Sequence, residues 1–169
     1  MGSHGLMGKN IWYDDAIRIP LYIRGPQVVK GHSDALIASQ DHMPTLLELL
    51  DAAVPDTVQG KSFASLARGA SMEEEPEHAF LCMILVEEYR KLGLNNKAFG
   101  WRGIRTKDIT YVVDNGTSPS ETQRRLFYDN KKDPLQLNPV ELDPQDAIAE
   151  AYDAVIRSYL RKTRDPFLL

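Results

Sequence analysis

Strand-forming runs joined by short turns fill the second half of the chain, and this pattern limits the fold more than any other feature. Lys107-Asp108 has the length of a tight hairpin connection, and Asn115-Gly116 marks another turn. Strands with such short links pair antiparallel, because parallel strands need a long crossover. The sequence therefore predicts an α+β fold with a small four-stranded antiparallel sheet. The expected strands are Ala79–Val86, Phe99–Thr106, Ile109–Val113 and Arg125–Asp129.

The last part of the chain predicts an amphipathic helix. Asp143 is suited to cap its first turn, and Pro144 suits the first helical position, where the backbone N–H has no partner anyway. Lys and Arg gather in the expected last turn, where they complement the helix dipole. We expect the apolar stripe of this helix to cover one face of the sheet. The stripe consists of Ile148, Tyr152, Val155 and Tyr159.

The first half predicts two short strands and one helix. Ile17–Ile23 alternates and is rich in β-branched residues, although Pro20 restricts it to an edge or bulged strand. Asp34–Ser39 is the second candidate strand. A helix capped by Asp41 is expected to follow it, with one apolar face. This face consists of Met43, Leu46, Leu47 and Leu50.

These first elements cannot close a hydrophobic core alone. We therefore divide the chain into residues 1–70 and a second part, residues 71–169, which contains the sheet and the C-terminal helix. The unpartnered apolar faces of residues 1–70 also predict self-association into a homo-oligomer.

Charge and hydropathy argue against two classes of partner. The net charge is −4, the pI is about 5.6, and no basic block interleaved with aromatic residues occurs, so a footprint for nucleic acid is lacking. The longest apolar run, residues 79–86, is far shorter than the roughly 20 residues that a membrane span needs. Cys82 lies inside this run, and we interpret it as an inert core thiol.

A glycine-rich stretch at the start of the chain contains two candidate functional side chains. His4 and Lys9 both precede the first expected strand. A lysine ammonium in a loop before a strand is well placed to neutralise an oxyanion. Neither residue identifies a reaction alone, because most lysines and histidines are solvated surface groups.

The order of motifs along the chain resembles that of the sulfatase family, within the alkaline phosphatase superfamily. Members of that family commonly read G-x-H-G-L-x-x-K followed by Y-E-x-x-I-R-x-P-L. Here GSHGLMGK is followed by the pair Tyr13-Asp14 and by IRIPL. Four later stretches resemble further family segments in the same order: SQDHMPTLLELL, VQGKS, WRGIRT, and LFYD with the DP and LN that follow it.

The resemblance implies that these residues form the C-terminal portion of an α/β sulfatase fold. The N-terminal part of such an enzyme would carry the central sheet and the C/S-x-P-x-R motif that supplies a formylglycine nucleophile. It would also carry most ligands of a divalent cation, usually calcium, so no metal ligand is expected in this chain. The chain alone is therefore expected to lack esterase activity.

The resemblance also implies roles for individual residues. Lys9 matches the family lysine that contacts the sulfate group of a small sulfate ester substrate, and His4 matches a motif histidine with a supporting role. Trp101 and Arg102 could reach toward the substrate, although a core position for Trp101 is the simpler interpretation. Structural roles are expected for Arg18, Asp41 and Arg105.

Two other functions stay open from the sequence. Phosphonate and phosphate ester hydrolases of the same superfamily share the G-x-H-G-L-x-x-K segment, and the residues that separate them from sulfatases lie outside this chain. Alternatively, residues 78–165 could act as an independent binding or assembly module, since a sheet with a helix can bury its own core.

Overall fold

The computed structural model describes residues 2–6, 10–72, 74–83, 98–117 and 120–169. The chain forms two compact units, one of Met1–Ile19 together with Phe80–Leu169 and the other of Pro20–Ala79. The N-terminal segment therefore belongs with the sheet, whereas the sequence analysis grouped it with the residues up to 70.

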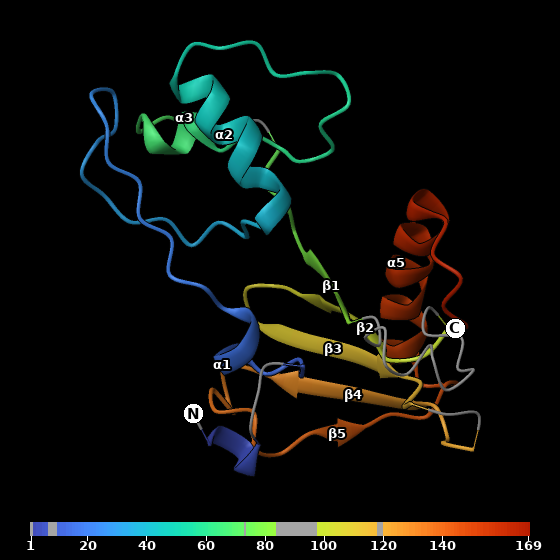
Figure 1. Ribbon diagram of the computed structural model, residues 1–169. Coiled ribbons are helices and arrows are strands. Elements are labelled where there is room, and N and C mark those ends of the chain that lie inside the picture. The colour runs from blue at the N-terminus through green and yellow to red at the C-terminus, as the bar shows by residue number, and fades with distance from the viewer. Residues whose placement is uncertain (1, 7–9, 73, 84–97, 118–119) are drawn as a thin grey trace. The chain divides into compact units, whose positions relative to one another are not determined.

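The elements are drawn in Figure 1. The helices and 3-10 turns (η) are η1 (Ser3–Gly5), α1 (Asp14–Ile17), η2 (Ser39–Asp41), α2 (His42–Leu49), α3 (Ala64–Ala67) and α5 (Ala147–Thr163). The strands are β1 (Ala79–Met83), β2 (Trp101–Arg105), β3 (Ile109–Asp114), β4 (Arg124–Asp129) and β5 (Val140–Glu141).

The strands form one sheet in the order β1-β2-β3-β4-β5. The predicted hairpin around Lys107-Asp108 is confirmed, and the pairs β2–β3, β3–β4 and β4–β5 are all antiparallel. The sheet has five strands rather than the expected four, because Val140 pairs with Phe127 and Glu141 with Leu126. β5 has only two residues, both exposed, which is too short for a recognisable alternation of apolar and polar residues. The sequence therefore did not predict this strand.

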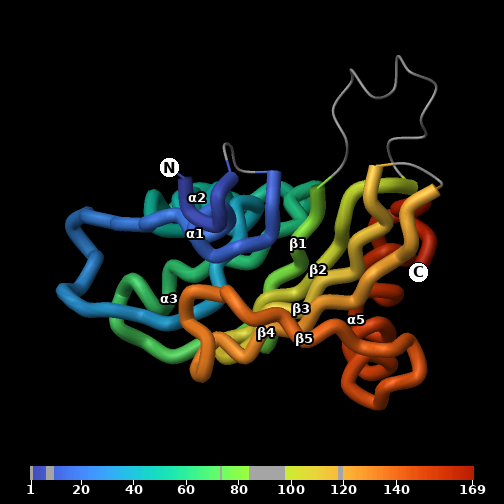
Figure 2. The backbone as a smooth tube through the Cα atoms, turned by 90° about the horizontal axis from the view of Figure 1, so that it is seen from below, coloured from blue at the N-terminus to red at the C-terminus, as the bar shows by residue number. Residues whose placement is uncertain are grey.

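One face of the sheet packs against α5, as Figure 2 shows. Side chains alternate between the two faces of a strand, so residues at every second position share a face. Tyr111 and Val113 of β3 face α5 together with Ile104 of β2, and all three are fully buried. The helix contributes Ala149, Ile156 and Leu160 to this core.

The opposite face packs against the N-terminal segment. Its core consists of Trp101, Val112, Leu126 and Tyr128 from the sheet and Trp12 from the segment. In Figure 2 the N-terminal segment and α5 lie on opposite sides of the strands. The sheet is therefore covered on both faces, and Ile11, Trp12, Tyr13 and Ile17 of the N-terminal segment supply one of the two covers.

The helix α5 begins later than the sequence predicted. Its N-cap is Asp146, whose carboxylate accepts a hydrogen bond from the backbone N–H of Ile148 at 2.8 Å. Asp143 instead accepts from the N–H of Gln145 at 2.9 Å in the preceding turn. The buried face is also displaced by about one residue from the predicted stripe, because Asp153 is buried through its polar partners. This face consists of Ala149, Asp153, Ile156 and Leu160.

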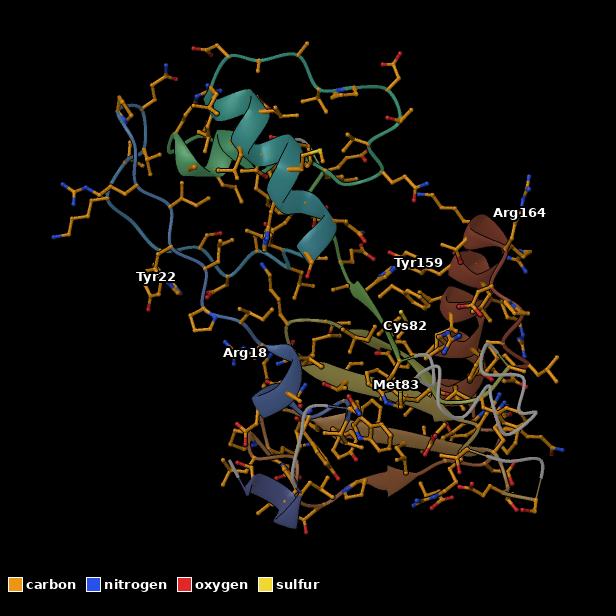
Figure 3. All side chains as sticks on the ribbon, in the orientation of Figure 1. Arg18, Tyr22, Cys82, Met83, Tyr159 and Arg164 are labelled. Carbon is orange, nitrogen blue, oxygen red and sulfur yellow. The ribbon has the colours of Figure 1, made fainter. Side chains whose placement is uncertain are left out.

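The first part of the predicted strand Ala79–Val86 is confirmed as β1, and residues 84–86 lie outside the described residues. Cys82 is exposed, so its interpretation as a core thiol was wrong. The cause is the edge position of β1, which leaves part of the strand uncovered. Its neighbours Leu81 and Met83 do pack on the face with Trp12, and Figure 3 labels Cys82 and Met83.

The unit Pro20–Ala79 contains α2 and α3, and its described residues (20–72 and 74–79) form no strand apart from the first residue of β1. The strands expected at Ile17–Ile23 and Asp34–Ser39 are not formed, since α1 takes up Ile17 and no described strand pairs with residues 18–25 or 34–38. Strands need a neighbour for their backbone hydrogen bonds. Ile19, Leu21 and Tyr22 are accordingly exposed, Tyr22 to 92%, and Figure 3 labels Tyr22.

The predicted apolar face of α2 is also largely exposed, and the helix buries Pro44 and Thr45 instead. Asp41 holds this unit together through the backbone. Its carboxylate accepts from the N–H of Ala38 and of Lys61, both at 2.8 Å, rather than from the first turn of α2. Thr45 extends the link, because its hydroxyl accepts from the N–H of Phe63 at 3.0 Å.

Candidate active-site segment

The motif stretch at the start of the chain is described on both sides of Lys9, which itself lies outside the described residues. His4 lies in the 3-10 turn η1 with a left-handed backbone, φ 56° and ψ 20°. Its ring stacks on that of Tyr13, with centroids 3.6 Å apart and ring planes 1° apart. The histidine of the motif is therefore held against the pair Tyr13-Asp14 further along the same motif.

Trp12 fixes the segment to the sheet. Its indole is 6% exposed, and the indole N–H donates to the hydroxyl of Tyr128 at 2.9 Å. The Trp12 ring also meets that of Trp101 edge-on, with centroids 5.8 Å apart. Burial raises the pKa of Tyr128, against the opposing effect of the bond from Trp12, so its hydroxyl stays protonated at neutral pH.

Asp14 forms an ion pair with β2. The Nε and Nη2 atoms of Arg105 donate to the two carboxylate oxygens of Asp14, each at 3.0 Å. Arg18 approaches the same carboxylate at 3.6 Å, but its side chain is 74% exposed, and an exposed pair contributes little. The backbone N–H of Asp14 donates to Oε1 of Gln136 at 2.6 Å, and Gln136 is 2% exposed.

Trp101 and Arg102, predicted near the substrate, lie on opposite faces of β2. Trp101 is 4% exposed, and its indole N–H donates to the carbonyl oxygen of Asn10 at 3.2 Å. Arg102 is fully buried, and its guanidinium donates to both carboxylate oxygens of Asp165, at 2.8 and 3.0 Å. It also lies over the ring of Phe167, 4.6 Å from the centroid. Trp101 thus contacts the N-terminal segment, and Arg102 holds the C-terminal tail.

The face of the sheet that packs against α5 contains a buried polar cluster centred on Asp153. The Tyr111 hydroxyl donates to one oxygen of Asp153 at 2.7 Å, and Nε of Arg125 donates to the other at 3.0 Å. Burial is the main cause that raises the pKa of Tyr111, and its bond to Asp153 adds to this effect. The Tyr111 hydroxyl and the Arg125 guanidinium thus each have a hydrogen-bond partner in the carboxylate of Asp153, which indicates a structural role for the cluster.

The described part of the chain shows neither a metal centre nor a membrane span. No three His, Cys, Asp or Glu side chains in it gather closely enough to hold a metal ion. No helix among the described residues has the length and apolar character needed to cross a membrane.

A surface pocket of about 310 Å³ lies within the unit Pro20–Ala79. Its lining is mostly apolar, and Tyr22, Arg24 and His42 are its ionisable members. His4, Trp12, Tyr13 and Asp14 are not among its lining residues, so we take the N-terminal segment and its sheet face as the candidate site.

Two residues of this site were not predicted as site residues from the sequence. Tyr128 was expected only as part of a strand and a family-like motif, and Gln136 lies in an irregular stretch after β4. Both act through contacts with residues more than 110 positions away, which periodicity cannot reveal.

Comparison with known proteins identifies the family. The model of the family described as "N-sulphoglucosamine sulphohydrolase, C-terminal" matches residues 2–163. The Endo-4-O-sulfatase of Bacteroides thetaiotaomicron is 30% identical over an alignment of 164 residues, which covers 94% of this chain and 32% of that protein. The chain spans about a third of the length of the curated relatives it matches.

Two solved structures share the fold. The phosphonate monoester hydrolase of Silicibacter pomeroyi superposes with a TM-score of 0.68 at 23% identity, over 94% of this chain and 31% of that one. A protein solved with its substrate D-glucosamine-2-N,6-O-disulfate superposes with a TM-score of 0.65 at 22% identity, over 96% of this chain and 31% of that one. Motif order, family match and fold agree, and the chain belongs to this sulphohydrolase C-terminal family as a C-terminal sulfatase region of the alkaline phosphatase superfamily.

Proposed function

We propose that the protein containing this region, here called the parent enzyme, hydrolyses a small sulfate ester and that Lys9 contacts the sulfate group. The observation that carries the proposal is the family match over residues 2–163, which includes the whole GSHGLMGK motif. The sugar substrates in the names of the relatives belong to those proteins, and here they support only the class of sulfated small molecules.

The chemistry of Lys9 suits this role. The sulfate oxygens gain negative charge as the ester S–O bond breaks, and a compact ammonium group stabilises that charge. His4 supports the motif from its stacked position on Tyr13. Trp101 and Arg102 are assigned to holding the two chain ends, because both side chains are buried in those contacts.

We infer that the divalent cation, calcium, and the formylglycine nucleophile are contributed by other parts of the parent enzyme. The C/S-x-P-x-R motif does not occur in these 169 residues. Since the described residues do not assemble a metal site, no step of the reaction is assigned to a metal held by them. The cation, when bound, would neutralise charge on the sulfate oxygens.

A phosphonate ester hydrolase is the second candidate. The similarity to the Silicibacter phosphonate monoester hydrolase favours it, although that likeness at 23% identity concerns the fold. The sulfatase relatives match at equal coverage and higher identity, so sulfate ester hydrolysis is the better supported activity.

The test compares para-nitrophenyl sulfate with an aryl phosphonate ester as substrates of the parent enzyme. We expect faster turnover of the sulfate, and equal or faster phosphonate turnover would reverse the assignment. Lys9→Ala should lower sulfate turnover by about 10²-fold or more, as the loss of an oxyanion stabiliser does. Lys30→Ala is the control, because Lys30 is an exposed lysine outside the motif.

A further inference from the structure

We propose that one face of the sheet positions the motif segment for catalysis, with Arg105 and Tyr128 as the positioning residues. The inference rests on the proposed function, since it assigns these residues to the same reaction. The segment concerned is residues 10–17, which directly follow Lys9 in the sequence. Arg105 lies on β2 and Tyr128 on β4, so neither is a neighbour of the motif along the chain.

The pair of Arg105 and Asp14 fixes the direction of the segment. Two parallel N–H···O bonds define the plane as well as the distance of the carboxylate, which a single bond does not. The side chains are 13% and 17% exposed, so solvent screens the pair little. The guanidinium of Arg105 also bonds to the carbonyl oxygen of Thr106, which ties it to the β2–β3 turn.

Further contacts act on the same segment on either side of Asp14. The indole N–H of Trp101 donates to the carbonyl oxygen of Asn10, the residue after Lys9. The hydroxyl of Tyr128 accepts from the indole N–H of Trp12. Gln136 accepts from the backbone N–H of Asp14 itself. Residues 10, 12 and 14 are therefore each hydrogen-bonded to the C-terminal half of the chain, through β2, β4 and the stretch after β4.

A fixed position of this segment affects the rate if the neighbouring Lys9 stabilises the transition state, as proposed above. A displacement of about 1 Å can reduce turnover about 10²-fold, even when its cause lies away from the reacting atoms. The positioning contacts are satisfied within the unit that contains both the segment and the sheet. We infer that the sheet contributes to the rate although it supplies no reacting group.

The chain contains a matched control for the Asp14–Arg105 pair. Arg102 lies three positions before Arg105 on β2 and forms a bidentate pair with Asp165 on the other face, at 2.8 and 3.0 Å. That pair holds the C-terminal tail and lies on the face of β2 opposite to the motif segment. Asp14→Asn and Asp165→Asn therefore make the same chemical change on opposite faces of one strand.

The experiment measures kcat, KM and Tm of both variants in the parent enzyme with para-nitrophenyl sulfate. We expect Asp14→Asn to lower kcat by about 10- to 100-fold with KM changed less than about threefold, because only transition-state contacts are lost. Asp165→Asn should lower Tm while kcat stays within about twofold. Equal effects of the two variants on kcat would overturn the proposal.

If Asp14→Asn does not fold, a second pair of variants still tests the proposal. Tyr128→Phe and Tyr111→Phe each remove one buried hydroxyl, on opposite faces of the same sheet. Amide hydrogen exchange at Ala16, Ile17 and Arg18, whose N–H groups bond within α1, gives a readout that needs no activity. We expect exchange there to accelerate about tenfold or more in Tyr128→Phe and to stay unchanged in Tyr111→Phe.

The outcomes separate this inference from the proposed function. If the unsubstituted parent enzyme does not cleave sulfate esters but exchange accelerates as expected, the proposed function fails and the sheet still holds the segment. If the enzyme is active and the Tyr128→Phe and Asp14→Asn variants keep full kcat, the positioning role is wrong and the proposed function stands. Unchanged exchange in both variants also overturns the positioning role.

Discussion

Asp14 and Arg105 are 91 positions apart in the sequence and joined by two hydrogen bonds of 3.0 Å. The bond pair joins a residue of the motif segment to the second strand of the C-terminal sheet. Residues 78–165 taken alone would leave the face with Trp101 and Tyr128 without its cover. The sheet and the motif segment are one structural unit, and the idea of an independent module at residues 78–165 loses support.

Truncation of Trp12 should strongly destabilise the unit that contains the sheet. Trp12 is 6% exposed and packs against Trp101, so Trp12→Ala should cost about 3–5 kcal/mol in the free energy of unfolding. Tyr22→Ala is the control, because Tyr22 is 92% exposed and its loss should change the free energy by less than about 0.5 kcal/mol. Urea unfolding followed by tyrosine fluorescence and circular dichroism measures both. Similar values for the two variants would contradict the packing described here.

The carboxylate of Asp153 should be essential to the face that packs against α5. Asp153→Ala would leave Arg125, which is 6% exposed, without its buried partner, at a cost of about 3–5 kcal/mol. Arg157→Gln should cost less than about 1 kcal/mol, since Arg157 is 47% exposed and lies 3.8 Å from the same carboxylate. Thermal unfolding of both variants provides the comparison, and a stable Asp153→Ala would show that the cluster contributes little.

Gly60 should tolerate no side chain. A Cβ atom there would lie 2.0 Å from the carbonyl oxygen of Gln40, a backbone contact that cannot relax without displacing the turn next to Asp41. Gly60→Ala should therefore destabilise the unit Pro20–Ala79. Gly31→Ala serves as control, because nothing lies within 4 Å of its Cβ. Hydrogen exchange at the N–H of Lys61 and Phe63 reports on this unit, and equal exchange in the two variants would refute the expected clash.

Asp114 and Asp129 should change the pH dependence of stability in opposite directions. As the pH rises, the contribution of Asp114 to stability should fall and that of Asp129 should grow. Burial raises the pKa of Asp114, against the bond from the N–H of Gly116, so folding favours its protonated form. Its stabilising contribution is present below the unfolded pKa of about 3.9 and lost as the pH rises through the folded pKa. Asp114→Asn should therefore raise Tm at neutral pH, and this gain should shrink in acid.

Asp129 is the counterpart in that experiment. A hydrogen bond from Lys132 lowers its pKa, so its contribution is present at neutral pH and lost as the pH falls through the folded pKa. Asp129→Asn should lower Tm at neutral pH. Tm measured from acid to neutral pH tests the two substitutions together, and a lower neutral Tm for Asp114→Asn would show the sign to be wrong.

The sequence predicted the elements whose signals are local. Alternation and a two-residue turn are sufficient for the β2–β3 hairpin, and apolar spacing is sufficient for the existence of α5. The start of α5 was misplaced because Asp143 and Asp146 are equally good caps by residue type. Only the bond from the N–H of Ile148 distinguishes them.

The remaining errors have a common physical cause. Ile17–Ile23 has the composition of a strand, but strand formation depends on a partner that composition does not reveal. In the same way, the motif identified His4 and Lys9, but not Tyr128 or Gln136, whose roles follow from contacts across the sheet. Side chains that act over long separations in the sequence need the fold before they can be recognised.

The two arginines of β2 also determine how the chain would carry a mechanical load. Arg105 is paired with Asp14 and Arg102 with Asp165, so residues near both chain ends are attached to one strand within three positions of each other. Tension applied between residues 14 and 165 would pass through about 10 Å of β2 and two ion pairs. The unit Pro20–Ala79 is not part of that short path. It would therefore carry no tension until one of the two ion pairs breaks.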